Sequence, residues 1–150
     1  MSRRHYAVQV PLRWSDMDAY GHVNNVQYLR LMEDARITAF QAWFGPRNTL
    51  LSSGCLVARS EIEYLAPLPF QHEGVLIDVW VSGIGGASFD LAYEIRDPES
   101  VGDRLFARAE TTLVWYDFEA QGPRRGTAAE REVLERMAGE PVHMRRRGTR

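Results

Sequence analysis

Apolar and polar residues alternate at the start of the chain and then change to a helical period. Residues 6–14 have an apolar residue at every second position, which is typical of a strand buried on one face: Tyr6, Val8, Val10, Leu12 and Trp14. After a polar turn at 16–25, apolar residues recur at helical spacing from Val26 to Phe44, and Gly45-Pro46 predicts the end of the helix. Two apolar stripes run along this helix, which predicts that other elements cover most of its sides.

Four more strand patterns follow, with no second long helix between them. They cover residues 56–64, 75–82, 89–96 and 104–116, and a glycine-rich turn at 83–86 and Asp97-Pro98 separate neighbouring strands. Thr127 to Glu130 resembles a capping box, which predicts a short helix to about Ala138. This order predicts an α+β fold in which a curved, antiparallel five-stranded sheet wraps one long helix. Its open strand edges favour pairing with a second copy of the chain.

Composition narrows the class of protein. A chain of 150 residues, 45% hydrophobic and 25% charged, predicts a single domain over 1–150, with its core at about 5–117 and a short helix at 127–138. A basic tail at 143–150 completes the chain, but the net charge of −2 gives no general attraction to nucleic acid. The single cysteine, Cys55, excludes an intramolecular disulfide and is interpreted as a small core residue. Because no segment resembles a signal peptide or a membrane-spanning helix, we expect a cytoplasmic protein.

Candidate chemistry is concentrated in the segment RWSDMDAYGHVNNVQYLRLMEDAR, residues 13–36. It lies at the N-terminus of the predicted helix, where backbone N–H groups lack intrahelical partners and the helix dipole is positive. Asp18 is the candidate nucleophile or general base, although its spacing equally fits an Asx-turn or a helix cap. Asp16 directly follows the strand, which favours a turn-forming role.

Asn24 and Asn25 stand where the helix should begin, and one of them is expected to cap it. A backbone N–H in this first turn, for which Asn25 is the candidate, would stabilise negative charge developing on a substrate carbonyl. Gly21 fits a tight bend or a close approach of backbone to a ligand. His22 could orient Asp18, line a pocket or cap the turn, and a supporting role is favoured over catalysis.

Two further patterns in this segment have structural interpretations. DMDAYG opens like a calcium-binding loop, but the fifth position is Tyr20 and the twelfth is Gln27, so the signature fails and we expect no metal site. Glu33 and Arg36 fit an ordinary solvated or ion-paired helix face. If the helix is buried, Glu33 needs a partner, for which Arg36 or Arg30 is available.

Segment 13–36 resembles the signature of the 4-hydroxybenzoyl-CoA thioesterase-like branch of the hotdog-fold acyl-CoA thioesterases. The core of that signature reads D-x-D-x-x-G-H-V-N-N-x-x-Y followed by a hydrophobic residue, and then E-x-A-R. Further similarity lies in ARSEIEYLAPL at 58–68, GIGGASFDLAYEIRD at 83–97 and AETTLVWYD at 109–117. Together these segments span most of residues 6–117, whereas the arginine-rich part after Asp117 departs from the motif.

The resemblance implies that Asp18 is catalytic and that the Asn25 amide polarises the substrate carbonyl. It also implies a homodimer with active sites between protomers, whereas a tetramer stays open. Coenzyme A would be part of the substrate rather than a cofactor, with its phosphates on surface loops. The residues expected to contact substrate are Tyr20, Gly21, His22, Asn24, Tyr28, Arg59, Gly86 and Ser88.

The leading hypothesis is therefore hydrolysis of an acyl-CoA to free acid and CoA. One alternative is an enoyl-CoA hydratase or dehydratase of the same fold, in which Asp18 and His22 would form an acid/base pair. The other is a non-catalytic acyl-CoA-binding sensor, since one fold supports many functions. The aromatic residues of the helix, Tyr28, Phe40 and Trp43, permit a medium or long aliphatic chain or an aromatic acyl group.

Overall fold

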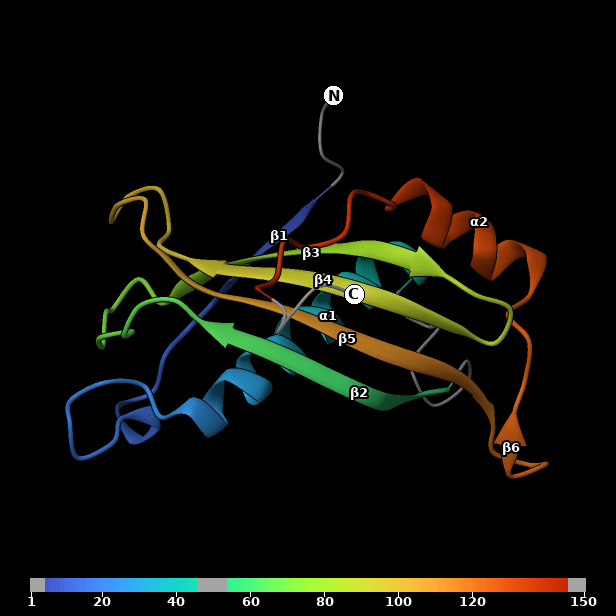
Figure 1. Cartoon of the computed structure of the whole chain (residues 1–150), viewed down its shortest axis with the longest axis horizontal. Helices are drawn as coiled ribbons and strands as arrows, with labels where there is room; N and C mark the ends of the chain where they lie inside the picture. The colour runs from blue at the N-terminus through green and yellow to red at the C-terminus, as the bar shows by residue number, and fades with distance from the viewer. Residues whose placement is uncertain (1–4, 46–53, 146–150) are drawn as a thin grey trace.

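The main sheet has five strands and packs against one long helix. A computed structural model describes residues 5–45 and 54–145. The elements in chain order are β1 (Tyr6–Val10), η1 (Trp14–Asp16), α1 (Asn25–Phe44), β2 (Cys55–Tyr64), β3 (Val75–Ile84), β4 (Ser88–Arg96), β5 (Leu105–Asp117), β6 (Gly122–Pro123) and α2 (Ala128–Arg136). The main strands are all antiparallel in the order β1-β3-β4-β5-β2, and α1 runs along one face of the sheet (Figure 1). The α+β architecture predicted from the sequence is confirmed, and β6 is a two-residue addition paired with β5.

The core lies between α1 and the sheet. Alternate residues of β4 face the helix and are fully or almost fully buried, as their spacing predicts: Phe89, Leu91, Tyr93 and Ile95. The buried stripe of α1 consists of Tyr28, Leu31, Met32, Ala35, Arg36, Ala39 and Phe40. Val26 and Leu29, however, are 63% and 48% exposed, so the prediction that other elements cover most of the helix is wrong for its first two turns in a single chain.

Two strand predictions fail where the backbone leaves regular geometry. The first strand ends at Val10, and η1 redirects the chain so that Trp14 is 75% exposed instead of continuing the buried face. In β2, a bulge between Val57 and Arg59 shifts the alternation. Leu56 is therefore exposed, although the sequence pattern places it on the same face as Ile62, which packs against the core.

The two edges of the sheet differ in whether another segment covers them. Beyond the end of β1, the backbone of β3 is covered by the segment after α2, because Val81 N–H donates to Met137 O (2.9 Å) and Gly139 N–H donates to Val81 O (2.8 Å). The predicted capping box starts α2 as expected, with reciprocal bonds between Thr127 and Glu130. In contrast, β2 pairs only with β5 among the described residues, so its outer edge is open.

The described part of the chain has no helix that is both long enough and apolar enough to cross a membrane. Of the predicted basic tail at 143–150, residues 146–150 lie outside the described residues.

A buried carboxylate closes the connection between β4 and β5. Asp97 accepts hydrogen bonds from Arg104 Nε (2.8 Å) and from Gln71 Nε2 (3.0 Å), and it is 2% exposed. The hydrogen bond from the Arg104 side chain is the main reason that the pKa of Asp97 lies below its usual value of 3.8.

We predict that Asp97→Asn lowers the free energy of unfolding at pH 7 by about 2 kcal/mol, since it weakens a charge-assisted network. A folded-state pKa below the unfolded one means that this stabilisation is present above the unfolded pKa and is lost as the pH falls through the folded pKa. Urea unfolding at neutral pH and at a pH below 3.8 should therefore show a difference from wild type that shrinks in acid. Glu99→Gln, an exposed change in the same turn, is the control. A pH-independent difference for Asp97→Asn would contradict the assignment.

Candidate active site

Asp16 fixes the chain that leads into the site. Its carboxylate is fully buried and accepts hydrogen bonds from Arg13 N–H (2.7 Å), Arg13 Nη2 (3.0 Å) and Arg30 Nη2 (2.8 Å). Its carbonyl oxygen accepts from Asn24 N–H (2.8 Å). The segment that follows β1 is therefore joined to the first two turns of α1, and the structural role predicted for Asp16 is confirmed.

The loop 18–22 folds around the side chain of Asp18. Asp18 Oδ1 accepts from the backbone N–H groups of Tyr20 (2.9 Å) and His22 (3.4 Å), and Asp18 N–H donates to His22 O (2.8 Å). Gly21 has a φ of +80°, a conformation that favours glycine, so its predicted role in a tight bend is confirmed. Asp18 does form an Asx-turn, but only with one oxygen. In the described part of the chain Oδ2 has no hydrogen-bond partner, so it is available to a substrate or to water.

The first turn of α1 leaves one backbone donor free. Asn24 is the N-cap, because its Oδ1 accepts from Val26 N–H (3.1 Å), while its carbonyl accepts from Gln27 N–H (2.9 Å). Asn24 N–H is itself bonded to Asp16. Asn25 N–H has no partner among the described residues. An unpaired amide at the positive end of a helix is a donor for an anionic or polarised oxygen.

Asp18 and Asn25 line the same groove, which has a cavity volume of about 350 Å³. Its lining residues are Asp18, Val23, Asn25, Tyr28, Tyr64, Leu65, Ala66, Pro67 and Leu68. Val23 N–H donates to Leu68 O (2.8 Å), which fastens the loop before α1 to the segment after β2. The groove thus combines one carboxylate, one free amide and mostly apolar walls.

Tyr28 and Tyr64 form part of the wall of the groove. Their rings pack edge to face with centroids 4.9 Å apart, and Tyr64 Oη donates to Asn25 O (3.3 Å). Burial, and to a lesser degree the neighbouring Tyr64, raises the pKa of Tyr28 to about 12. Tyr28 is therefore neutral near pH 7 and cannot serve as a base there.

The structure brings together only some of the residues predicted to contact substrate. Tyr20 and Gly21 form the exposed loop beside Asp18, and His22 contacts Asp18 through its backbone amide rather than its imidazole. Tyr28 lines the groove, and Asn24 lies beside it as the N-cap of α1. Arg59, Gly86 and Ser88 do not line it.

Arg59 forms ion pairs with Glu110 and Glu61 on the sheet. Gly86 lies in the turn between β3 and β4, and Ser88 is the first residue of β4. This turn lies at the opposite end of the sheet from the start of α1 (Figure 1). Within one chain they are therefore separated from Asp18.

Tyr64 and the segment Leu65 to Leu68 were not among the predicted contacts. The available signal was the segment 58–68 itself, which carries part of the sequence resemblance; Pro67 lies near its end and Pro69 directly follows it. This signal did not identify Tyr64 as a wall residue, because the contact of Tyr64 with Asn25 joins residues 39 positions apart in sequence.

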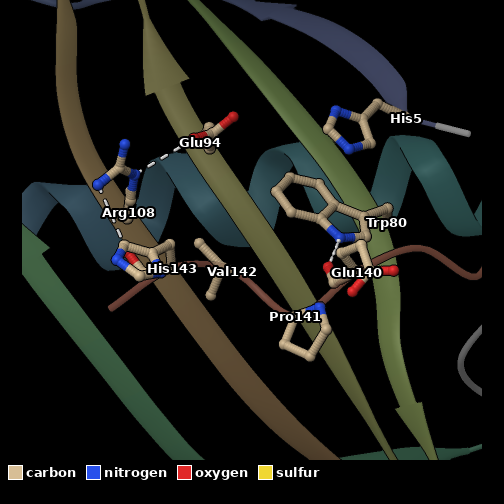
Figure 2. Close-up of a pocket in the computed structure, with 8 residues that line it drawn as sticks. All are labelled: His5, Trp80, Glu94, Arg108, Glu140, Pro141, Val142 and His143. Atoms are coloured by element: carbon tan, nitrogen blue, oxygen red, sulfur yellow. Dashed lines mark hydrogen bonds and ion pairs between the residues drawn. The ribbon is translucent and has the colours of Figure 1, made fainter. Parts of the chain in front are cut away.

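A second cavity, of about 120 Å³, lies on the face of the sheet opposite α1 (Figure 2). There the C-terminal segment crosses the strands: Trp80 Nε1 donates to Glu140 O (2.6 Å), and Arg108 bridges Glu94 (3.3 Å) and His143 O (3.4 Å). The bonds to Glu140 O and His143 O fix the segment to the sheet, which indicates a structural role for this region.

Two further kinds of site, a metal centre and a reactive cysteine, were compared with the described residues. No group of three or more His, Cys, Asp or Glu residues in ranges 5–45 and 54–145 is placed to hold a metal ion. Cys55 is partly buried against the core, and burial raises the pKa of its thiol to about 11. It is therefore protonated near neutral pH, in agreement with a core role.

The two aspartates should respond differently to substitution. We predict that Asp16→Asn lowers the free energy of unfolding by about 2 kcal/mol, because it removes a buried charge from two arginines. Asp18→Asn keeps an oxygen that can accept the two loop N–H groups and should stay within about 0.5 kcal/mol of wild type. Denaturant unfolding of both variants measures this contrast, and equal losses would contradict it.

The sequence and the fold of this chain are similar to those of known proteins. The sequence model of the thioesterase-like superfamily matches residues 12–138. No curated protein matches the chain.

Among solved structures, the chain is similar to a predicted thioesterase from Bacillus stearothermophilus, with a TM-score of 0.81, 20% identity, and coverage of 92% of this chain and 99% of that one. It is also similar to a thioesterase from Thermus thermophilus complexed with coenzyme A and Zn, with a TM-score of 0.75, 30% identity, and coverage of 92% and 97%. A putative thioesterase from Pseudomonas aeruginosa gives a TM-score of 0.74, 25% identity, and coverage of 85% and 96%. The chain therefore belongs to the thioesterase-like superfamily and is a thioester hydrolase with the hotdog fold.

Proposed function

We propose that the protein hydrolyses an acyl-CoA to a free acid and CoA, with Asp18 and the Asn25 amide as its catalytic groups. The observation that carries the proposal is that one groove holds both a carboxylate oxygen without a partner and an unpaired helix N-terminal amide. The CoA bound to the Thermus thermophilus relative supports this choice of substrate class.

In the proposed reaction, the thioester carbonyl oxygen accepts a hydrogen bond from Asn25 N–H, which stabilises the charge that develops on it. Asp18 then either attacks the carbonyl carbon, giving an anhydride that water cleaves, or removes a proton from an attacking water molecule. In both routes the C–S bond breaks and CoA leaves as a thiolate, which needs no general acid. Label in the Asp18 carboxylate after a single turnover in ¹⁸O-labelled water would establish nucleophilic attack, because general-base catalysis places the label only in the released acid.

The hydratase alternative needs an acid/base pair, for which the sequence offers Asp18 and His22. The only bonds of His22 to Asp18 in the described structure run through backbone atoms of His22, and its imidazole makes no hydrogen bond there. This arrangement supports hydrolysis over addition of water to an enoyl thioester.

We also propose that two copies of the chain form the functional unit by pairing their β2 edges. The open edge of β2 carries exposed apolar residues, Leu56 at 44% and Val57 at 49%. Val26 and Leu29 of α1 are exposed as well, so the single chain leaves much apolar surface for a second copy to cover. The active sites would then lie between the two protomers.

We predict that Asp18→Asn lowers kcat for acyl-CoA hydrolysis by at least about 10²-fold while CoA still binds. Thiol release, read with a chromogenic disulfide from short, medium, long and aromatic acyl-CoAs, measures this and identifies the preferred acyl group. Glu33→Gln, an exposed acidic residue of α1, is the matched control. Near-normal turnover of Asp18→Asn would contradict the role of Asp18.

The Asn25 amide can be removed without breaking the helix. Asn25 is the first helical residue, a position that accepts proline, and Asn24 before it has the extended backbone (φ −61°, ψ 137°) that proline requires of its neighbour. We expect Asn25→Pro to lower kcat by about 10²-fold or more, because the oxyanion loses its donor. Asn25→Ala keeps the N–H group and should retain activity. Equal activity of the two variants, with folding checked by circular dichroism, would rule out the amide.

A further inference from the structure

Arg36 is an almost fully buried cation that the proposed reaction does not use. It belongs to the buried stripe of α1, is 8% exposed, and reaches the sheet, where its Nη1 donates to Tyr93 Oη (3.1 Å). Tyr93 is fully buried on β4, and burial raises the pKa of its hydroxyl group, so this group is neutral near pH 7. The contact gives Arg36 a hydrogen bond but no opposite charge.

The carboxylate paired with Arg36 in the described part of the chain is a weak partner. Glu33 Oε2 lies 3.8 Å from Arg36 Nη2, and the Glu33 side chain is 60% exposed, so water competes for it. By contrast, the buried carboxylate of Asp16 is held by two arginines at 3.0 Å and 2.8 Å. A guanidinium group has several N–H donors, and burying its charge is unfavourable unless an anion pairs closely with it. Arg36 therefore has charge and donors left for a further acceptor.

The register of the sheet places Arg36 one row of side chains from the candidate groove. Tyr64, which lines the groove, is the partner of Ala107 on β5, and Ala109, further along β5 on the same face, is the partner of Tyr93. The two alanines are separated by one residue, which on a strand is a distance of roughly 7 Å. Both alanines are fully buried in the core, so β5 contributes only methyl groups between Tyr64 and the contact of Tyr93 with Arg36.

Arg36 also lies on the side of α1 that faces β2. Val26, Leu29 and Arg36 recur at helical spacing along this side, and the first two are exposed. Asp34 and Thr38, on the other side of α1, line a cavity with β1, which is the opposite edge of the sheet from β2. The seam between α1 and β2 therefore runs from the groove to Arg36, and its outer side is open in a single chain. A second copy paired along β2, as proposed above, would cover it.

We infer that Arg36 is a specificity-determining residue that binds a carboxylate at the far end of the acyl group, so that the preferred substrates are CoA thioesters of dicarboxylic acids. A carboxylate supplies the closely paired anion that the guanidinium lacks and accepts its N–H groups in pairs. Arg36 lies roughly 16 Å beyond Asn25 along the helix axis, and helical side chains lean toward the N-terminus, so an acyl chain of medium length spans the remaining distance. The inference rests on the proposed function for the position of the thioester.

Substrate pairs that differ only in the terminal carboxylate test the inference. The wild type should hydrolyse adipoyl-, suberoyl- or sebacoyl-CoA with a kcat/KM at least about tenfold above that of the matching hexanoyl-, octanoyl- or decanoyl-CoA. We expect Arg36→Met to reduce this preference by about tenfold or more, while its turnover of the plain acyl-CoA stays near that of the wild type. Arg108→Met, which changes an ion-paired arginine on the opposite face of the sheet, is the matched control. A wild type that prefers the plain acyl-CoA, or an unchanged preference in Arg36→Met, would overturn the inference.

A second variant separates the charge of Arg36 from its packing. Arg36→Met should fold, because replacing a poorly paired buried charge by an apolar side chain costs little stability, and circular dichroism checks this. Arg36→Lys keeps the positive charge but not the paired donors, so it should retain part of the preference for the dicarboxylic substrate. Equal losses of both variants on both substrate classes would mean that Arg36 has only a structural role and would overturn the inference.

A binding test distinguishes this inference from the proposed function. S-alkyl-CoA thioethers with and without a terminal carboxylate contain no thioester and cannot be hydrolysed. In calorimetry, the carboxylated thioether should bind the wild type about tenfold more tightly than it binds Arg36→Met, whereas the plain thioether should bind both proteins equally. This result would support the role of Arg36 even if the protein hydrolyses no acyl-CoA. Equal binding of the carboxylated thioether to both proteins would overturn that role even if acyl-CoA is hydrolysed.

Discussion

The buried carboxylate of Asp16 is the constraint on which the rest of the site depends. A fully buried charge is tolerated only when it is paired, and here two arginines and two stretches of backbone converge on one residue. Arg13 belongs to the segment after β1 and Arg30 to α1, so the ionic contact sets the position of the helix relative to the strand. The loop that holds Asp18 lies between these two fixed points, and its geometry follows from them.

The two groups that we propose as catalytic are distinguished by the hydrogen bonds they lack. The Asn24 cap satisfies Val26 N–H and its carbonyl accepts from Gln27, which leaves Asn25 N–H unpaired. Asp18 uses one oxygen for its own loop and keeps the other. The loop bonds fix the carboxylate without using up its capacity to react. An interpretation as a turn and an interpretation as a catalytic residue are therefore compatible for Asp18.

Local patterns in the sequence predicted local structure well. The alternation of β4, the cap at Asn24 and the box at Thr127 depend on neighbouring residues, and all three are confirmed. The exposed Trp14 and the bulge in β2 escaped prediction, because a change of chain direction or of register leaves no periodic signal. The Tyr64 wall also could not be placed, since a contact over 39 positions arises only from the folded topology.

The pairing of β2 with β5 has a consequence for how the chain folds. Cys55 and Trp115 are register partners 60 positions apart, and β2 has no other neighbour in the described sheet, so it joins only after β5 is in place. Closing so long a loop is slow compared with forming the hairpins of β3, β4 and β5. Because the end of β2 supplies Tyr64 and leads into Leu68, we expect the candidate groove to be completed late in folding and to be absent from partly folded chains.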